Sequence, residues 1–284
     1  MELTGSRERT REACEEARRK ELIVGFVPTM GFLHDGHLSL ARRAREECDF
    51  TVMSIFVNPL QFGPSEDLAA YPRDLERDTR LAEEASMDLV FSPSPEQMYP
   101  QGRPIVTVDP GLMGERLEGA SRRGHFRGVC TVVAKLFDIV GSCRAYFGEK
   151  DAQQLAVIRR MTADLDMPVE VVGCPTVREH DGLAMSSRNI YLSSEEREAA
   201  LCLSRALFEA MAMVEGGERD ADVLRARMRA RIEDEPLAAL DYSTVVDDRT
   251  FGELDRIAGP ARALVAARFG QARLIDNALL SGED

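Results

Sequence analysis

Apolar strand-like runs alternate with amphipathic helical stretches over the first two-thirds of this 284-residue chain, and this alternation is the feature that most constrains its fold. The strand-like runs cover residues 22–27, 51–57, 88–91, 145–147 and 169–172, and the helical stretches cover residues 37–47, 74–85, 126–140 and 151–165. A strand, a helix and a second strand within about 35 residues form a βαβ unit, which favours parallel strands and right-handed crossovers. The repeated pattern therefore predicts an α/β fold with a Rossmann-like, doubly wound parallel sheet.

The pattern changes after about residue 177. Ser193, with Glu196 three residues later, is a capping-box signal for a long helix that reaches about residue 214, where Gly216 and Gly217 end it. A charged helix follows at residues 221–232, and short strand-like runs follow at residues 242–246, 263–267 and 273–275. This order predicts a second, smaller α+β domain, so we expect domains at residues 1–177 and 178–284.

Composition excludes several classes of protein. A hydrophobic content of 44% and a charged content of 30% are typical of a globular chain. The 36 Lys and Arg residues against 49 Asp and Glu residues give a net charge of −13, which argues against a nucleic-acid scaffold but leaves a nucleotide substrate open. The six cysteines form no C-x-x-C pair, the first twenty residues contain no signal peptide, and no run approaches the roughly 18 apolar residues of a membrane span. We therefore expect a cytoplasmic protein that binds neither nucleic acid nor membrane.

The strongest local signal is the segment G-F-L-H-D-G-H at residues 31–37, between a predicted strand and a predicted helix. Open α/β sheets bind ligands at the carboxyl ends of their strands, and a helix N-terminus favours anionic phosphates. His34 and His37 share one face if the helix begins early, and imidazoles there can donate hydrogen bonds as charge moves onto a pyrophosphate leaving group. The alternative is one capping or core histidine and one surface histidine. Two histidines beside Gly31 and Gly36 favour a phosphate site, and they are too few to favour a metal site.

Polar residues also follow two other predicted strands. Asn58 and Gln61 carry amides that donate and accept together, which suits a hydroxy-carboxylate substrate, although Asn-Pro alone is an ordinary turn. In the segment G-E-K-D-A-Q-Q, Lys150 is a mobile charge suited to a phosphate, and Gln154 lies one turn into the next helix. Asp151 fits a simpler role as a helix cap.

The segment D-G-L-A-M-S-S-R-N at residues 181–189 comes after the last predicted strand of the α/β region. Adjacent hydroxyls of Ser186 and Ser187 beside Arg188 are typical of a mobile loop that clamps a polyphosphate, with the arginine neutralising charge. By itself this composition is common on protein surfaces. Together with the other segments, we interpret it as part of a nucleotide site.

Taken together and in this order, the segments resemble the pantothenate synthetase (pantoate–β-alanine ligase) family of the H-x-G-H nucleotidylyltransferase superfamily. Its motifs P-T-M-G-x-L-H-x-G-H, F-V-N-P-x-Q-F, G-H-F-R-G, F-G-E-K-D-x-Q-Q and D-G-L-A-M-S-S-R-N match residues 28–37, 56–62, 124–128, 147–154 and 181–189. The resemblance implies a two-step reaction that depends on ATP and Mg²⁺. Pantoate is first converted to pantoyl adenylate with release of pyrophosphate, and β-alanine then displaces AMP to give pantothenate. It also implies a homodimer in which the second domain acts as a lid.

The resemblance also implies roles for individual residues. His34 and His37 stabilise the departing pyrophosphate, with His37 as proton donor. Lys150 and Arg188 are the main phosphate cations and, with the histidines, the expected catalytic residues. The residues expected to contact ATP are Met30, Gly31, Phe32, Leu33, His34, Asp35, Gly36, His37, Gly148, Glu149, Lys150, Asp151, Val177, Met185, Ser186, Ser187 and Arg188.

Two other functions compete with the ligase. A nucleotidylyltransferase would use the same phosphate site but transfer the nucleotide to a phosphate. The resemblance implies that Gln61 and Gln154 bind pantoate, and neutral side chains suit a carboxylate better than a phosphate acceptor. A non-catalytic nucleotide-binding or regulatory module would need neither this second pocket nor the histidine pair.

The chain departs from the family pattern at a few positions. His180 replaces a small residue before Asp181, and Arg123 replaces a common proline before Gly124. Neither position has an expected role in the site. Asp78 is a candidate for holding Mg²⁺, but Arg77 beside it thins the acidic cluster, so the metal ligands stay unassigned.

Overall fold

The computed structural model describes residues 1–63, 68–69 and 71–281, and the chain forms two compact units. The first unit contains Met1–Glu149 and Val157–Pro175. The second contains Lys150–Ala156 and the chain from Thr176 onward.

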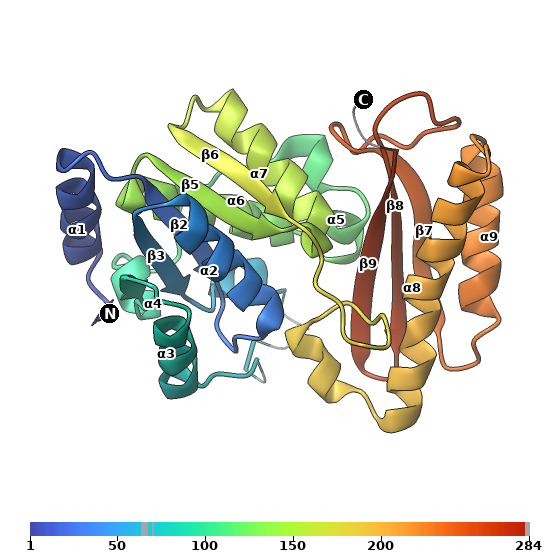
Figure 1. Cartoon of the computed structure of the whole chain (residues 1–284), viewed down its shortest axis with the longest axis horizontal. Helices are drawn as coiled ribbons and strands as arrows, with labels where there is room; N and C mark the ends of the chain where they lie inside the picture. Colours follow the sequence, from blue (N-terminus) through green and yellow to red (C-terminus); the bar gives the residue numbers. More distant parts are fainter. Residues whose placement is uncertain (64–67, 70, 282–284) are drawn as a thin grey trace. The chain divides into compact units, whose positions relative to one another are not determined.

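The first unit is built on a parallel sheet with the strand order β1-β4-β3-β2-β5-β6 (Figure 1). Its strands are β1 (Glu2–Thr4), β2 (Val24–Thr29), β3 (Phe50–Ile55), β4 (Leu89–Phe91), β5 (Cys143–Gly148) and β6 (Val169–Cys174). From β2 the chain continues to β3 on one side and later returns to β5 on the other. The order therefore reverses at β2, where doubly wound sheets bind their ligands. The predicted Rossmann-like sheet is confirmed.

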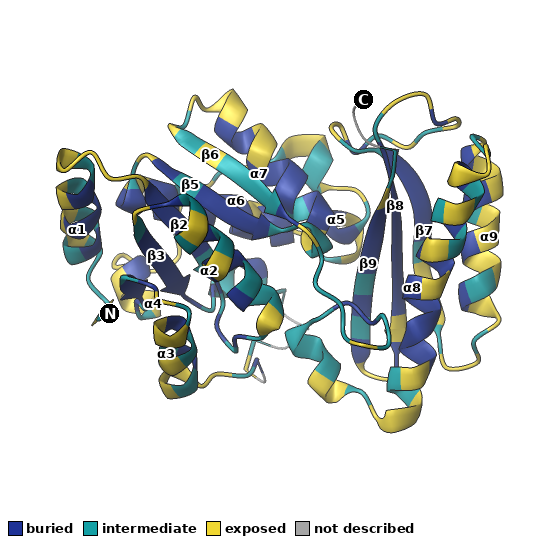
Figure 2. Ribbon diagram, in the orientation of Figure 1, coloured by how far each residue is buried: buried dark blue, intermediate teal, exposed yellow. Residues whose placement is uncertain are grey.

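Helices cover both faces of this sheet. They are α1 (Arg7–Arg19), α2 (Asp35–Glu47), α3 (Leu75–Glu84), α4 (Pro95–Met98), α5 (Glu118–Ser121), α6 (His125–Val140) and α7 (Ala152–Asp164). Side chains alternate between faces, so Val27 and Met53 pack with Ala41 of α2, whereas Phe26 meets Phe137 of α6 with ring centroids 6.4 Å apart. Figure 2 shows the mostly buried strands β2, β3 and β5 between helices that are exposed on their outer faces, whereas β6 is half-buried.

The first twenty residues, for which no strand or helix was predicted, form β1 and α1. Ser6 caps α1 by accepting a hydrogen bond from the backbone N–H of Arg9 at 3.1 Å, and β1 pairs in parallel with β4. The unit therefore gains an edge strand and a further helix.

The second unit is an α+β structure, as predicted. Two helices, α8 (Ser194–Glu215) and α9 (Ala221–Glu233), pack on an antiparallel sheet of β7 (Ala239–Asp247), β8 (Ala261–Phe269) and β9 (Ala272–Ser281). The predicted capping box of Ser193 and Glu196 is present at the start of α8. The strands run past the predicted runs, because charged residues such as Asp247 and Arg268 continue the ladder.

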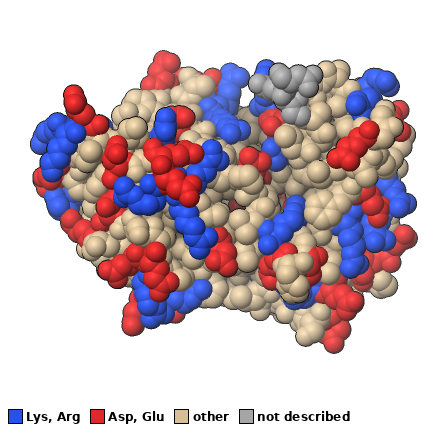
Figure 3. All heavy atoms as spheres, in the orientation of Figure 1, with Lys and Arg blue, Asp and Glu red and all other residues tan. Residues whose placement is uncertain are grey.

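Acidic and basic side chains are intermixed on the face of the molecule in Figure 3, in keeping with a net charge of −13 made of both signs. In the described part of the chain, no helix has the length and apolar character needed to cross a membrane.

Candidate active site

The segment after β2 turns sharply before it enters α2. Thr29 accepts a hydrogen bond from the Gly31 N–H at 3.2 Å through its hydroxyl, which donates to the Ser54 carbonyl at 2.8 Å. Gly31 and Phe32 then adopt positive φ angles of 82° and 50°. A side chain at position 31 would place its Cβ 2.8 Å from the carboxylate of Asp78, so the turn requires glycine there.

His34 and His37 form a capping box at the N-terminus of α2. His34 Nδ1 accepts from the Gly36 N–H at 3.2 Å, and His37 Nδ1 accepts from the His34 N–H at 3.4 Å. The helix begins at Asp35, two residues before the predicted start at residue 37, so the condition for a shared face is met, and the ring centroids are 4.1 Å apart. The capping part of the simpler hypothesis holds for both rings, whereas neither ring is an exposed surface histidine. An Nδ1 that accepts a hydrogen bond carries no proton, so a neutral ring keeps its proton on Nε2, where it can donate to a phosphate oxygen.

Gln61 lies beside this turn. It ends a short 3-10 helix (Pro59–Gln61) after β3, and its Nε2 donates to Met30 Sδ at 3.1 Å. Asn58 is 1% exposed and donates to Gln61 Oε1 at 3.1 Å, while the Tyr99 hydroxyl donates to Asn58 Oδ1 at 2.7 Å. The structure therefore brings Gln61 to residues 30–37, and buried neighbours fix its amide.

The G-H-F-R-G segment begins α6 and supports the same 3-10 helix. His125 Nδ1 lies 2.9 Å from the Gln61 carbonyl oxygen, and a Cβ at Gly128 would lie 2.3 Å from the Leu60 carbonyl oxygen. The motif is visible in the sequence, but its spacing alone indicates no role. Its glycine is explained by this close approach of two backbones, which residues far apart in the chain create.

Lys150 occupies a short 3-10 helix (Glu149–Asp151) directly after Gly148, the last residue of β5. Its side chain is 20% exposed and its Nζ lies 3.6 Å from Asp151 Oδ1. Asn277 of β9 donates from Nδ2 to the Lys150 carbonyl oxygen at 2.9 Å, which ties this segment to the sheet of the second unit. Gln154 lies on the first turn of α7 and is partly exposed.

The segment from Val177 to Arg188 is held by a polar network. The Met185 N–H donates to the Val177 carbonyl at 3.0 Å, and Ser186 caps the 3-10 helix Ser187–Tyr191 by accepting from the Arg188 N–H at 3.2 Å. Arg197 of α8 forms ion pairs with Glu179 at 2.8 Å and Asp181 at 2.7 Å. Ser186 and Arg188 thus lie on a supported turn.

Asp78 does not fit the role of a magnesium ligand. Its two oxygens accept hydrogen bonds from the Phe32 and Leu33 N–H groups at 2.6 and 2.7 Å, and the residue is 1% exposed. Burial raises the pKa of Asp78 above its ordinary value, although the Leu33 and Phe32 amides act to lower it. Among the described residues, no group of three or more His, Cys, Asp or Glu side chains could hold a metal ion.

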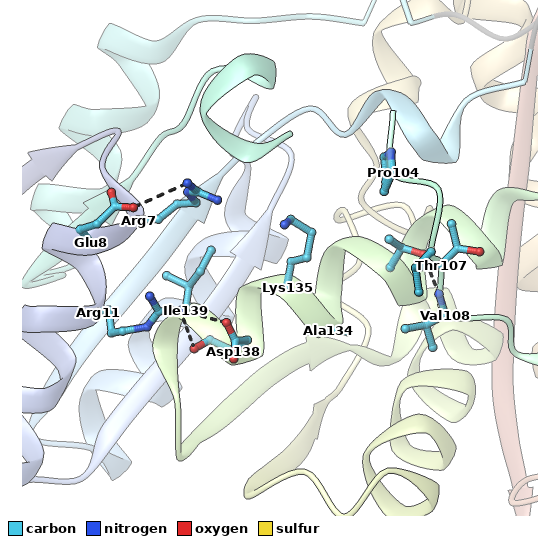
Figure 4. Close-up of a pocket in the computed structure, with 12 residues that line it drawn as sticks. Arg7, Glu8, Arg11, Pro104, Thr107, Val108, Ala134, Lys135, Asp138 and Ile139 are labelled. Carbon is cyan, nitrogen blue, oxygen red and sulfur yellow. Dashed lines mark hydrogen bonds and ion pairs between the residues drawn. The ribbon is translucent and has the colours of Figure 1, made fainter. Parts of the chain in front are cut away.

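A pocket of about 500 Å³ lies elsewhere in the first unit, between α1, α6 and residues 104–108 (Figure 4). Arg11 and Asp138 form an ion pair of 2.9 Å at its wall, and Lys135 and Thr107 also line it. The predicted site residues do not line this pocket.

A doubly wound parallel sheet with a glycine turn and paired imidazoles at a helix N-terminus defines a Rossmann-like nucleotide-binding enzyme. The chain matches the family model described as pantoate-beta-alanine ligase over residues 2–279. It is 60% identical to a pantothenate synthetase of Heliobacterium modesticaldum over 95% of this chain and 96% of that protein. The chain therefore belongs to the pantoate-beta-alanine ligase family and is a ligase, which confirms the resemblance seen in its motifs.

Solved structures agree with this assignment. A pantothenate synthetase of Thermus thermophilus superimposes with a TM-score of 0.92 at 49% identity, over 99% of this chain and 100% of that chain. The pantoate-beta-alanine ligase of Francisella tularensis, complexed with beta-gamma ATP and beta-alanine, superimposes with a TM-score of 0.78 at 32% identity over 99% of this chain and 98% of that chain.

Proposed function

We propose that this enzyme joins pantoate to β-alanine at the expense of ATP and releases pantothenate, AMP and pyrophosphate. The observation that carries the proposal is the His34–His37 capping box with Gln61 beside it, at the carboxyl ends of two adjacent strands. Family membership supports the substrates, as does the Francisella tularensis relative in complex with ATP and β-alanine.

In the first step, a carboxylate oxygen of pantoate attacks the α-phosphorus of ATP, and the bond from that phosphorus to the bridging oxygen of pyrophosphate breaks. Negative charge moves onto the pyrophosphate. The Nε2–H groups of His34 and His37, together with the N-terminus of α2, stabilise this charge by donating hydrogen bonds to it. Lys150 and Arg188 supply the positive charge for the β- and γ-phosphates.

In the second step, the amine of β-alanine attacks the carbonyl carbon of pantoyl adenylate, the bond to AMP breaks, and the nitrogen loses a proton. The mixed anhydride provides the driving force, so the protein mainly positions the reactants and excludes water. Gln61 and Gln154 bind pantoate through their neutral amides. The second unit, taken as the smaller C-terminal domain, acts as the lid that excludes water.

The proposed ATP site uses backbone and side-chain groups of residues 30–37, 148–151, 177 and 185–188. Mg²⁺ enters with ATP as a substrate complex, because the phosphates themselves can hold it with few protein ligands. We further propose a homodimer in the cytoplasm; the six buried free thiols suit that compartment.

The assay is direct. Incubation of the protein with ATP, Mg²⁺, pantoate and β-alanine should yield pantothenate and AMP in equal amounts, and neither product should form without pantoate. A folded sample that yields neither product refutes the proposal. His37→Ala should lower the rate of adenylate formation by about 100-fold or more while ATP affinity changes little. A collapse of ATP affinity with full turnover at saturation would contradict the leaving-group role.

A further inference from the structure

Asp78 of α3 holds the turn that leads into the histidine pair. Both of its oxygens accept backbone hydrogen bonds, one from Phe32 at 2.6 Å and one from Leu33 at 2.7 Å. We propose that Asp78 is a positioning residue: it fixes the backbone of residues 31–33 and so sets where His34 and His37 meet the phosphates. The reaction that it serves is the one proposed above, so this inference rests on that function.

The turn needs such a support because its backbone is unfavourable on its own. Phe32 has φ +50°, in the left-handed region that side chains with a Cβ rarely adopt, and Gly31 before it has φ +82°. Such conformations persist when the surroundings determine them. Leu33 is 0% exposed, so without Asp78 its N–H would be a buried donor that has lost its partner.

Arg77 reinforces the contact from the same helix. Its guanidinium carbon lies 5.3 Å from the centroid of the Phe32 ring, and its Nη1 lies 3.5 Å from Asp78 Oδ1. The two consecutive residues of α3 therefore hold Phe32 by its ring and by its amide. Ala82, one turn further along α3, is fully buried in the core with α2, so the support comes from a packed helix.

The replacement Asp78→Asn tests the role with almost no change in shape. The new amide nitrogen is a donor and must face an N–H that needs an acceptor, so the turn should shift. Glu76→Gln is the matched control, because it removes an exposed carboxylate from the same helix. At saturating ATP, adenylate formation by Asp78→Asn should fall by about ten- to a hundred-fold, since small misplacements of reacting groups have effects of that size. Glu76→Gln should keep the wild-type rate.

Two further measurements separate positioning from other roles. The Mg²⁺ concentration for half-maximal rate and the KM for β-alanine should stay within about two-fold of wild type in Asp78→Asn. Hydrogen exchange followed by NMR without substrates should show protected Phe32 and Leu33 amides in the wild type and faster exchange of both in the variant.

A wild-type rate in Asp78→Asn would overturn the proposal, and so would a loss repaired by excess Mg²⁺, which would mark a metal ligand. If Asp78→Asn does not fold, hydrogen exchange in the wild type tests the inference instead. Exchange of the Phe32 and Leu33 amides as fast as that of exposed amides would refute it. If the wild type lacks ligase activity, the proposed function fails, while the exchange measurement still shows whether Asp78 holds the turn.

Discussion

Replacing Arg178 with methionine should lower the free energy of unfolding of the second unit by about 3 kcal/mol, because Asp276 then stays buried without its counter-charge. Two N–H groups of Arg178 meet the two oxygens of Asp276 at 2.6 and 3.0 Å. The Asp276 side chain is 3% exposed and the Arg178 side chain 20% exposed, so water has little access to the carboxylate. The pair fixes the chain directly beside Val177, which we assign to the ATP site.

The change in the free energy of unfolding depends on whether a substitution leaves a buried charge without its partner. Loss of one partner from a buried ion pair costs about 3–5 kcal/mol. The lower end applies here, because the Asn277 N–H still donates to Asp276 at 2.8 Å. Methionine also keeps an apolar contact with the Phe208 ring, over which the Arg178 guanidinium lies at 5.2 Å.

Urea unfolding followed by far-UV circular dichroism measures this change, which suits a chain without tryptophan. Arg229→Met is the control: it breaks an exposed ion pair with Glu233 and should cost less than about 0.5 kcal/mol. The double variant Arg178→Met/Asp276→Leu should return to within about 1 kcal/mol of wild type, because it buries no unpaired charge. A double variant as unstable as Arg178→Met alone would refute the reasoning.

Two further predictions concern titrating groups. The thiols should react slowly with Ellman's reagent in the native protein, whereas all six should react in denaturant. All six are buried, and burial raises the pKa of Cys202, for example, to about 12. Prompt labelling of the native protein would contradict this. Hydrogen bonds from Arg43 and Tyr146 lower the pKa of Glu47 below its ordinary value, so this stabilisation is present above the unfolded pKa and disappears as pH falls through the folded one. Glu47→Gln should therefore cost about 0.5 kcal/mol at neutral pH, because the side chain is one-third exposed, and the cost should shrink as the pH falls through the folded pKa; a cost that does not change with pH would count against it.

The sheet of the first unit was predictable because its signals are local. Each buried strand is a short apolar run, and α2 starts beside glycines and cap-forming residues. The boundary of β2 shifted from residues 22–27 to Val24–Thr29 for a physical reason. Proline normally ends a central strand. However, β2 pairs with β5 only at Gly25 and Phe26, so at Pro28 the strand pairs with β3 on one side and no longer with β5 on the other.

The supports of the site were not predictable, because they join residues with no local pattern in common. Asp78 reaches the turn from 45 positions away, and Tyr99 reaches Asn58 from 41 positions away. Helix α1 was missed for a different reason: its buried face has helical spacing but consists of small residues such as Ala13 and Ala17 instead of large apolar ones.

The structural and catalytic hypotheses for His34 and His37 are not alternatives. Serine or aspartate would cap α2 equally well, but those side chains use their polar atoms in the cap. An imidazole has two nitrogens on opposite sides of its ring, so Nδ1 can satisfy the backbone while Nε2 keeps a proton for a ligand. The hydrogen bonds to both Nδ1 atoms thus set the tautomer and the ring orientation together. In the function that we propose, capping is therefore the means by which the helix directs two hydrogen-bond donors at an anion, and Asp78 acts one step earlier by placing the turn that carries them.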